Sequence, residues 1–189
     1  MKKRKGKLFV VSAPSGSGKT TLCAKILNTR NIKISRSVSM TTRPPRGDEK
    51  NGRDYFFIDL ANFKQMIKQR AFLEWAKVFD HFYGTPYRFI EETLSCGKNV
   101  LLNIDVQGAL QIKRKMPQSI LIYIVPPSMQ ELKMRLLKRN TEAMKEIKKR
   151  LEVAREELKK IKHYKYVIVN DNVRQATARL KDIINKELT

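Results

Sequence analysis

Ala13 to Thr20 is a glycine-rich stretch whose residue types and spacing suit the binding of a phosphate chain. Gly16 and Gly18 allow the backbone to turn its N–H groups towards an anion, because glycine adopts conformations that other residues rarely reach. The Lys19 ammonium group would reach the outer phosphates, and the Thr20 hydroxyl would bind Mg²⁺. Alanine stands where this motif usually begins with glycine, which makes the match looser. The residues predicted to bind a nucleoside triphosphate are Ala13, Pro14, Ser15, Gly16, Ser17, Gly18, Lys19, Thr20 and Thr21.

Two predicted elements flank this loop and would position it. Residues 8–11 are apolar and partly β-branched, which predicts a buried parallel strand. Residues 21–27 are expected to form a helix with Leu22 and Ile26 on one face. Strand, loop and helix in this order form a P-loop, in which the positive end of the helix favours a bound phosphate.

The rest of the chain alternates predicted strands and helices. A parallel sheet covered by helices on both faces follows from this alternation, with ligands at the carboxyl ends of the strands. Residues 35–98 interrupt it, and their aromatic content indicates a small mixed insertion, with a proline-broken loop at 39–48. Strands are expected at 55–58, 72–79, 100–105, 120–125 and 166–169, and helices at 60–69, 106–115, 128–140, 142–162 and 173–188.

Glu74 interrupts a predicted strand whose neighbours on the same face are apolar. A carboxylate in such a place is costly unless it is paired, so it forms a structural salt bridge, faces water at a sheet edge, or binds a ligand. Guanine suits it as a ligand, because guanine presents its N1–H and its exocyclic amine side by side and a carboxylate accepts both. Adenine has an acceptor at the matching position, and discrimination of about 10⁴ is possible when a buried polar site is left unpaired.

Two arginines border the buried faces of predicted helices. Arg139 continues the apolar stripe of its helix, and Arg150 lies beside that of the next helix. Either their stems pack and their heads reach water, or both cations point to a shared anion, as phosphoryl transfer requires.

Two further arginines flank a double proline. Arg43 and Arg46 lie on this stiff segment, and Tyr55 and Tyr83 supply phenol groups. Loop arginines are usually solvated, but a rigid pair can also hold a phosphate group through bidentate hydrogen bonds.

The chain of 189 residues carries 40 Lys and Arg against 18 Asp and Glu, a net charge of +22. This excess predicts affinity for polyanions, yet no nucleic-acid-binding module is recognisable, so we expect only weak nonspecific binding to nucleic acid.

Cys23 and Cys96 have neither disulfide-framework nor metal-site spacing, and no stretch is long enough to cross a membrane. A cytoplasmic protein of one domain, with no membrane partner, is the expectation.

Taken in order, these residues resemble the guanylate kinase family, whose members move a phosphoryl group from ATP to GMP. The matching stretches include Ser12 to Leu22, Asn51 to Tyr55, Phe72 to Ala76, Ile104 to Ala109 and Val167 to Asp171. They cover nearly the whole chain and are far more specific than the P-loop alone. The implied function is Mg²⁺-dependent transfer of the γ-phosphoryl group of ATP to GMP, giving ADP and GDP, in purine nucleotide metabolism and GMP recycling.

The resemblance also implies roles for individual positions. The expected readers of guanine are Ser39, Glu74, Thr85 and Asp105. The expected holders of the GMP phosphate are Arg43, Arg46, Tyr55 and Tyr83. The expected catalytic residues are Lys19, Arg43, Arg139 and Arg150. Arg139 and Asn170 would lie near adenine, and Thr20 would bind Mg²⁺ mostly through water and phosphate.

Three positions depart from the family pattern. Thr85 stands where serine is frequent, Asn103 where an acidic residue is common, and Asn140 where glycine is usual. Asn103 would loosen the support of the site, and Asn140 would stiffen the hinge of the lid. None of these changes removes a group that the chemistry needs.

The implied fold is an α/β P-loop three-layer fold with a central parallel sheet, a small mixed GMP-binding insertion and a helical lid. We expect a core domain over residues 1–34, 99–126 and 158–189, a GMP-binding subdomain over 35–98 and a lid over 127–157. A monomer or a small homo-oligomer is expected.

Three other functions would fit parts of the pattern. A guanylate-kinase-like binding module would have lost catalysis, but Lys19, Arg139 and Arg150 are present. A small-molecule kinase with another acceptor is opposed by Glu74 and Asp105. A nucleic-acid-binding ATPase would show tight, strongly salt-dependent binding.

Overall fold

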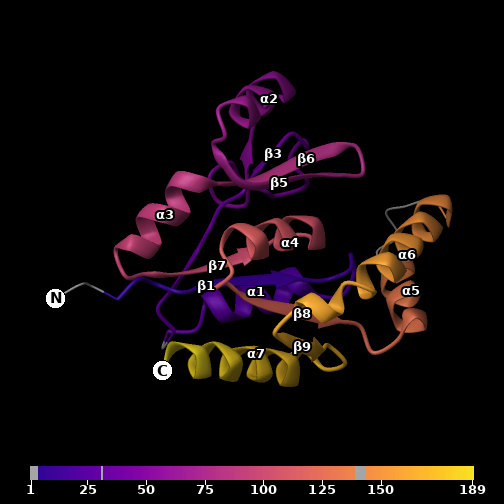
Figure 1. Ribbon diagram of the computed structural model, residues 1–189. Helices are drawn as coiled ribbons and strands as arrows, with labels where there is room; N and C mark the ends of the chain where they lie inside the picture. Colours follow the sequence, from indigo (N-terminus) through magenta and orange to yellow (C-terminus); the bar gives the residue numbers. More distant parts are fainter. Residues whose placement is uncertain (1–3, 31, 139–143) are drawn as a thin grey trace.

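The computed structural model describes residues 4–30, 32–138 and 144–189, and its centre is a five-stranded parallel sheet (Figure 1). The strand order is β2–β7–β1–β8–β9, and every neighbouring pair is parallel. Strands β1, β7, β8 and β9 are largely apolar, as expected where a parallel sheet is covered on both faces, whereas the edge strand β2 contains Ser35 and Arg36. Their bounds are β1 Leu8–Ser12, β2 Ile34–Arg36, β7 Asn99–Asn103, β8 Ile120–Val125 and β9 Tyr166–Val169.

Alternate side chains of β1 enter two different hydrophobic clusters, one on each face of the sheet. Phe9 and Val11 pack in the cluster that contains residues of α1 (Lys19–Leu27) and α7 (Val173–Leu188). Leu8 and Val10 pack in the opposite cluster with residues of α3 (Tyr87–Ser95) and α4 (Val106–Lys115). The period of two in a strand therefore builds both sides of the core, and the predicted three-layer α/β fold is confirmed.

A second sheet of four strands lies above the first in Figure 1 and has the order β4–β3–β6–β5. It is mixed, because β3 pairs in parallel with β4 and antiparallel with β6. Helix α2 (Leu60–Lys68) packs on it through Phe63, whose ring stacks on Phe72. The bounds are β3 Met40–Thr41, β4 Phe56–Phe57, β5 Phe72–Val78 and β6 His81–Pro86.

Some elements in this region differ from the sequence prediction. The segment 39–48, expected to be a loop, contributes the short strand β3, whose two residues pair with both neighbours. Strand β6 and helix α3 were not anticipated. The predicted strand at 55–58 is shorter, because only Phe56 and Phe57 pair with β3.

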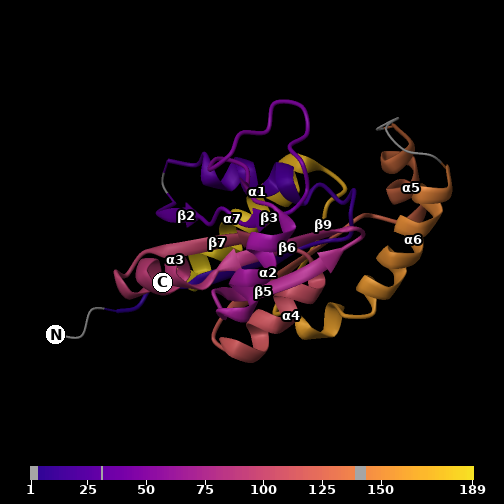
Figure 2. The same ribbon diagram turned by 90° about the horizontal axis from the view of Figure 1, so that it is seen from above.

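Helices α5 (Met129–Lys138) and α6 (Met144–Leu158) lie side by side at one side of the central sheet (Figures 1 and 2). They share a small cluster of their own, formed by Leu132, Leu136, Ile147 and Ala154. Helix α6 ends at Leu158 and a short 3₁₀ helix, Ile161–His163, follows, where one helix over 142–162 was predicted. The start of that predicted helix lies outside the described residues.

Helix α5 begins with half of a capping box. The Glu131 backbone N–H donates to Ser128 Oγ at 3.0 Å, while the Glu131 carboxylate pairs with Arg135 at 2.9 Å.

The expected division into core, GMP-binding subdomain and lid stays a prediction. The edge strand β2 crosses the expected boundary at residue 35. Among the described residues, none of the helices is both long enough and apolar enough to span a bilayer.

Candidate active site

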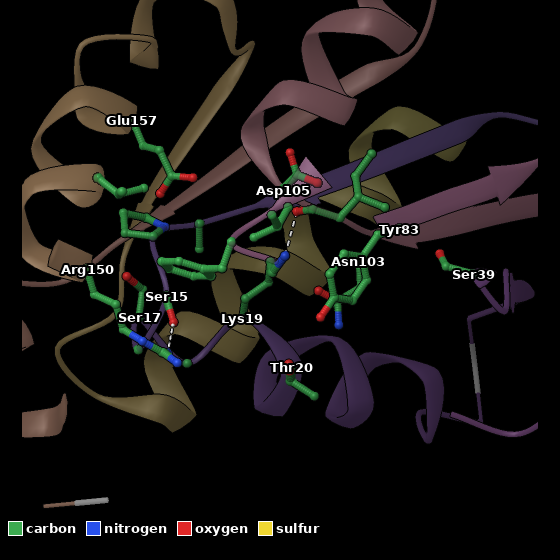
Figure 3. Close-up of a pocket in the computed structure, with 18 of the residues that line it drawn as sticks. Ser15, Ser17, Lys19, Thr20, Ser39, Tyr83, Asn103, Asp105, Arg150 and Glu157 are labelled. Atoms are coloured by element: carbon green, nitrogen blue, oxygen red, sulfur yellow. Dashed lines mark hydrogen bonds between the residues drawn. The ribbon is translucent and has the colours of Figure 1, made fainter. Parts of the chain in front are cut away.

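A cavity of about 320 Å³ opens at the carboxyl ends of β1 and β7, between the P-loop, the second sheet and α6 (Figure 3). Its lining combines residues predicted to bind the triphosphate with residues predicted to bind an acceptor. The predicted site residues that line it are Ala13, Pro14, Ser15, Gly16, Ser17, Gly18, Lys19, Thr20, Thr21, Ser39, Arg46, Tyr55, Glu74, Tyr83, Asp105 and Arg150.

The P-loop joins β1 to α1 through two glycines with left-handed backbones. Gly16 has φ = 94° and Gly18 has φ = 87°, and Gly18 is the N-cap of α1. These angles are unfavourable for other residues, so the glycines are needed for the turn itself. The loop is held from behind by Asn170, which is 2% exposed and donates from Nδ2 to the Ser17 carbonyl at 2.8 Å. Asn170, expected near adenine, therefore contacts the loop and does not line the cavity.

Lys19 begins α1, and its side chain crosses to the end of β7. Its Nζ donates to the Ile104 carbonyl at 2.5 Å, as the dashed line in Figure 3 shows. Burial lowers the pKa of Lys19, while the nearby carboxyl group of Asp105 opposes this shift. The ammonium group is thus held beside the P-loop by the Ile104 carbonyl, where it could contact a bound phosphate.

Asp105 lines the cavity and also caps α4. The Asp105 Oδ1 accepts hydrogen bonds from the backbone N–H groups of Gln107 at 2.7 Å and Gly108 at 3.0 Å. The Asp105 backbone carbonyl accepts from Ser12 Oγ at 3.2 Å, which links Asp105 to the end of β1. The carboxylate is therefore fixed by the start of a helix before any ligand arrives.

Glu74 is 2% exposed although β5 is an edge strand, because α4 packs against it. The water-facing interpretation is therefore wrong. The Thr85 hydroxyl donates to Glu74 Oε1 at 2.5 Å, which places Thr85 behind the carboxylate and outside the cavity lining. A Cβ atom at Gly108 would overlap the Glu74 carboxylate, so glycine is required for this approach. Burial raises the pKa of Glu74 to about 7, and the charge of Asp105 adds to the shift.

Arg43 stands behind the cavity wall and does not line it. The side chain is 5% exposed and donates from Nη2 to both carboxylate oxygens of Glu49, at 2.8 and 3.0 Å. Its guanidinium lies 5.6 Å from the centre of the Tyr55 ring. Glu49 also accepts from the Arg46 backbone N–H at 2.9 Å, so it organises both arginines. Sequence reasoning missed Glu49, although an acidic residue three positions after Arg46 in a basic segment was a usable signal.

From α6, Arg150 reaches the P-loop, where its Nη1 donates to Ser15 Oγ at 2.9 Å. Arg139 and Asn140 lie outside the described residues. Glu157, from the same helix, also lines the cavity and was not predicted (Figure 3). It follows Arg150 by seven residues, two helical turns, so their shared face was a signal in the sequence.

Glu157 adds a third carboxylate to those of Glu74 and Asp105. Burial raises its pKa to about 7, Asp105 raises it further, and Lys19 opposes the shift. The cavity therefore contains the cations of Lys19 and Arg150 together with three carboxyl groups.

The fold and this cavity together define a P-loop kinase. One wall is a phosphate cradle at a helix N-terminus, and the other carries the buried carboxylate of Glu74, two phenols and Arg46, with Arg43 behind it. Phosphoryl transfer needs such an arrangement, because positioning and charge neutralisation supply most of the catalysis.

Comparison with known proteins gives the family. Residues 5–187 match the sequence model of guanylate kinase. The guanylate kinase of Caldanaerobacter subterraneus subsp. tengcongensis is 48% identical over 185 residues, covering 98% of this chain and 89% of that protein. The guanylate kinase of Wolbachia pipientis wMel is 47% identical over 186 residues, covering 98% and 92%. The crystal structure of guanylate kinase from Anaplasma phagocytophilum superposes with a TM-score of 0.82 at 36% identity, covering 99% of this chain and 88% of that one.

The chain belongs to the guanylate kinase family. Guanylate kinases are nucleoside monophosphate kinases, that is, ATP:GMP phosphotransferases. The resemblance drawn from the sequence is thereby confirmed.

Proposed function

We propose that this chain transfers the γ-phosphoryl group of Mg²⁺-bound ATP to GMP and releases ADP and GDP. The observation that carries the proposal is the shared cavity, in which the P-loop faces the buried carboxylate of Glu74. Membership of the guanylate kinase family supports it.

ATP would bind with its phosphates in the P-loop. The backbone N–H groups of the loop and the N-terminus of α1 favour the anion, and Lys19 contacts the β- and γ-phosphates. Arg150, already at Ser15, neutralises charge on the transferring group. We keep Arg139 and Asn170 as predicted contacts of the adenine side.

Mg²⁺ fits the first turn of α1. Thr20 lines the cavity there, directly after Lys19, and presents the hydroxyl oxygen that a hard cation accepts. Among the described residues no group of three or more His, Cys, Asp or Glu could hold a metal ion, so water and phosphate would complete the coordination. When bound, the ion shields the charge of the phosphates.

GMP would bind on the opposite wall. Glu74 accepts from the guanine N1–H and amine, while Asp105 and Ser39 complete the edge of the base and Thr85 orients Glu74. The GMP phosphate is placed by Arg46, Tyr55 and Tyr83, with Arg43 holding Tyr55 from behind.

No strong base is required in this scheme. The acceptor phosphate oxygen attacks a γ-phosphoryl group that is held in line, and movement of the lid over both nucleotides excludes water. The exclusion of water matters, because ATP in a P-loop open to water would be hydrolysed instead of transferring its phosphoryl group to GMP.

The test is ADP formation from ATP and Mg²⁺ with GMP, AMP, CMP, UMP or no acceptor. We expect rapid turnover with GMP alone. Turnover with another acceptor would keep the chemistry and contradict the roles of Glu74 and Asp105. A folded protein that binds GMP and forms no ADP would instead be a binding module.

We also propose a cytoplasmic location and a monomer or small homo-oligomer. The exposed thiol of Cys96 and the buried one of Cys23 are both free, which suits a reducing compartment. Cell fractionation tests the location, and analytical ultracentrifugation tests the oligomeric state.

A further inference from the structure

Phe79 occupies the turn between β5 and β6, and its backbone conformation is unusual for its residue type. Its φ is 54°, in the left-handed region that non-glycine residues other than Asn and Asp rarely adopt. Its side chain is 39% exposed, so a large apolar ring faces solvent as well. Strained positions of this kind persist where surrounding contacts or function require them.

The ring lies against two cations of α6. The Arg150 guanidinium carbon is 5.3 Å from the ring centre, and Lys149 Nζ is 5.7 Å from it. Both distances fall within the roughly 6 Å range of a cation–π interaction. Arg150 simultaneously donates to Ser15 of the P-loop, so one guanidinium contacts the phosphate cradle and the acceptor-side ring.

Phe79 also belongs to the walls of two cavities. It lines the nucleotide cavity together with the P-loop, and it lines a neighbouring cavity of about 600 Å³ between the β5–β6 turn and α6. The ring therefore stands where the second sheet and α6 meet, at the mouth of the nucleotide cavity.

We propose that Phe79 is a positioning residue for phosphoryl transfer, which holds the Arg150 guanidinium at the P-loop. The inference rests on the proposed function, which places Arg150 on the transferring group. An arginine side chain has many rotamers, and stacking of its planar cation on an aromatic face selects among them. Because ring and cation come from different parts of the fold, Arg150 is aligned only when the GMP side has approached α6.

The test compares single-site variants in the GMP-dependent assay. Phe79→Asn tolerates the left-handed backbone and lacks the ring, while Phe79→Tyr keeps a ring. Phe89→Ala removes an equally exposed aromatic side chain of α3 and is the control. We expect Phe79→Asn to lower kcat about 3- to 30-fold, the range of a cation–π contact, with little change in KM for ATP or GMP.

Two further readouts separate positioning from folding. Phe79→Asn should melt at the same or a higher temperature than the wild type, because the turn is relieved of strain, whereas a structural role would lower both stability and turnover. In an Arg150→Ala background, Phe79→Asn should cause no further loss, because the two residues act as a unit. Phe79→Tyr and Phe89→Ala should retain wild-type kcat.

Several outcomes would overturn the proposal. They are an unchanged kcat in Phe79→Asn, a loss that Phe79→Tyr shares, or a loss that persists in full without Arg150. A rise in KM for GMP at constant kcat would place the ring on GMP instead. If the wild-type chain forms no ADP with GMP, the proposed function fails and this inference with it; normal wild-type turnover with an unaffected Phe79→Asn removes this inference alone.

Discussion

Glu74 links GMP binding to pH, because its carboxyl group has a pKa raised to about 7 by burial. Accepting two N–H groups of guanine requires the ionised form, so binding below pH 7 must release a proton. We expect the Kd for GMP to rise by up to about tenfold per pH unit below that value. Calorimetric titrations between pH 5 and 8 would measure this.

The GMP phosphate itself gains a proton near pH 6 (about 6 for a phosphate monoester), so a control is needed. In Glu74→Gln, the part of the pH dependence of the Kd for GMP that is due to the carboxyl group should vanish. The affinity for GMP should be low at every pH. An identical pH dependence in Glu74→Gln would show that Glu74 does not read guanine. ATP binding should be unaffected in both proteins.

The same shift predicts how the unliganded protein responds to pH. The pKa of Glu74 is 4.5 as a reference and about 7 when folded, so the folded state binds the extra proton in between. The free energy of unfolding should therefore fall as pH rises from about 4.5 to about 7, and Glu157 contributes in the same sense. Urea unfolding without nucleotides should show a smaller fall in Glu74→Gln; an equal fall would contradict the shift.

Lys19 should be essential for turnover but not for stability. Removing a positioned cation from the transferring group costs about 10²–10³ in kcat. Burial lowers the Lys19 pKa, which means that its charge is destabilising where it lies, so Lys19→Met should be as stable as the wild type or more so. Lys25→Ala, on the exposed side of α1, is the matched control and should keep full activity. Normal turnover in Lys19→Met would exclude the P-loop mechanism.

At the scale of elements, helix α4 determines the position of the Glu74 carboxylate, because Gly108 leaves room for it. A methyl group at Gly108 would overlap the Glu74 carboxylate, whereas alanine favours the helix itself by about 1 kcal/mol. Gly108→Ala should displace Glu74 and raise KM for GMP at least about tenfold, with KM for ATP unchanged. In a Glu74→Ala background the same substitution should add nothing to KM for GMP. An unchanged KM in the single variant would show that Glu74 can move without loss.

Elements with strong patterns were predictable from the sequence, and elements with weak patterns were not. Strand β8 is a continuous apolar run, because both of its faces are buried. Helix α4 matches its predicted bounds, because one buried stripe along the helix requires apolar residues at regular spacing. Strand β3 has two residues and depends on its partners β4 and β6, so local sequence carries little information about it. Strand β6 was missed although it forms a hairpin with β5, because the two turn residues, Phe79 and Asp80, lack the glycine that usually marks such a turn.

The candidate site divides in the same way. The P-loop was predictable, because its glycines, lysine and threonine act through local backbone geometry. Glu49 and Phe79 were missed, because their importance lies in contacts with Arg43 and Arg150 across the fold. The adenine role of Asn170 stays a prediction, and its contact with the Ser17 carbonyl was not foreseen, because that contact joins residues 153 positions apart in the sequence.

At the scale of the whole molecule, the net charge of +22 remains without a specific role. No acidic residue precedes Asp48, so the positive charge is concentrated in the first part of the chain. We expect weak binding to single-stranded nucleic acid that is lost between about 50 and 200 mM salt. Fluorescence anisotropy with a labelled oligonucleotide would measure it; tight binding that survives 200 mM salt would revive a nucleic-acid-dependent activity.

The parts that surround the nucleotide cavity have cores of their own, except that Leu73 of β5 packs in a cluster of the central sheet. Helices α5 and α6 share their own cluster, and the second sheet packs on α2 through stacked aromatic rings such as Phe63 and Phe72. The two faces of the central sheet form two other clusters. Helices α5 and α6 can therefore move as a unit over the central sheet without exposing its core, whereas the second sheet is tied to the central sheet through Leu73.

Closure of these units should require both nucleotides, because each nucleotide contacts different walls of the cavity. We expect the radius of gyration from small-angle X-ray scattering to fall when GMP and a non-hydrolysable ATP analogue are added together, towards the value of about 16 Å for a compact chain of 189 residues. GMP alone should bring only the second sheet inwards and give a smaller fall. CMP with the analogue is the control, and the radius of gyration should fall no further than with the analogue alone. If the radius stays constant with both nucleotides present, the walls of the cavity are already in their working positions, and the rate of turnover is not limited by their movement.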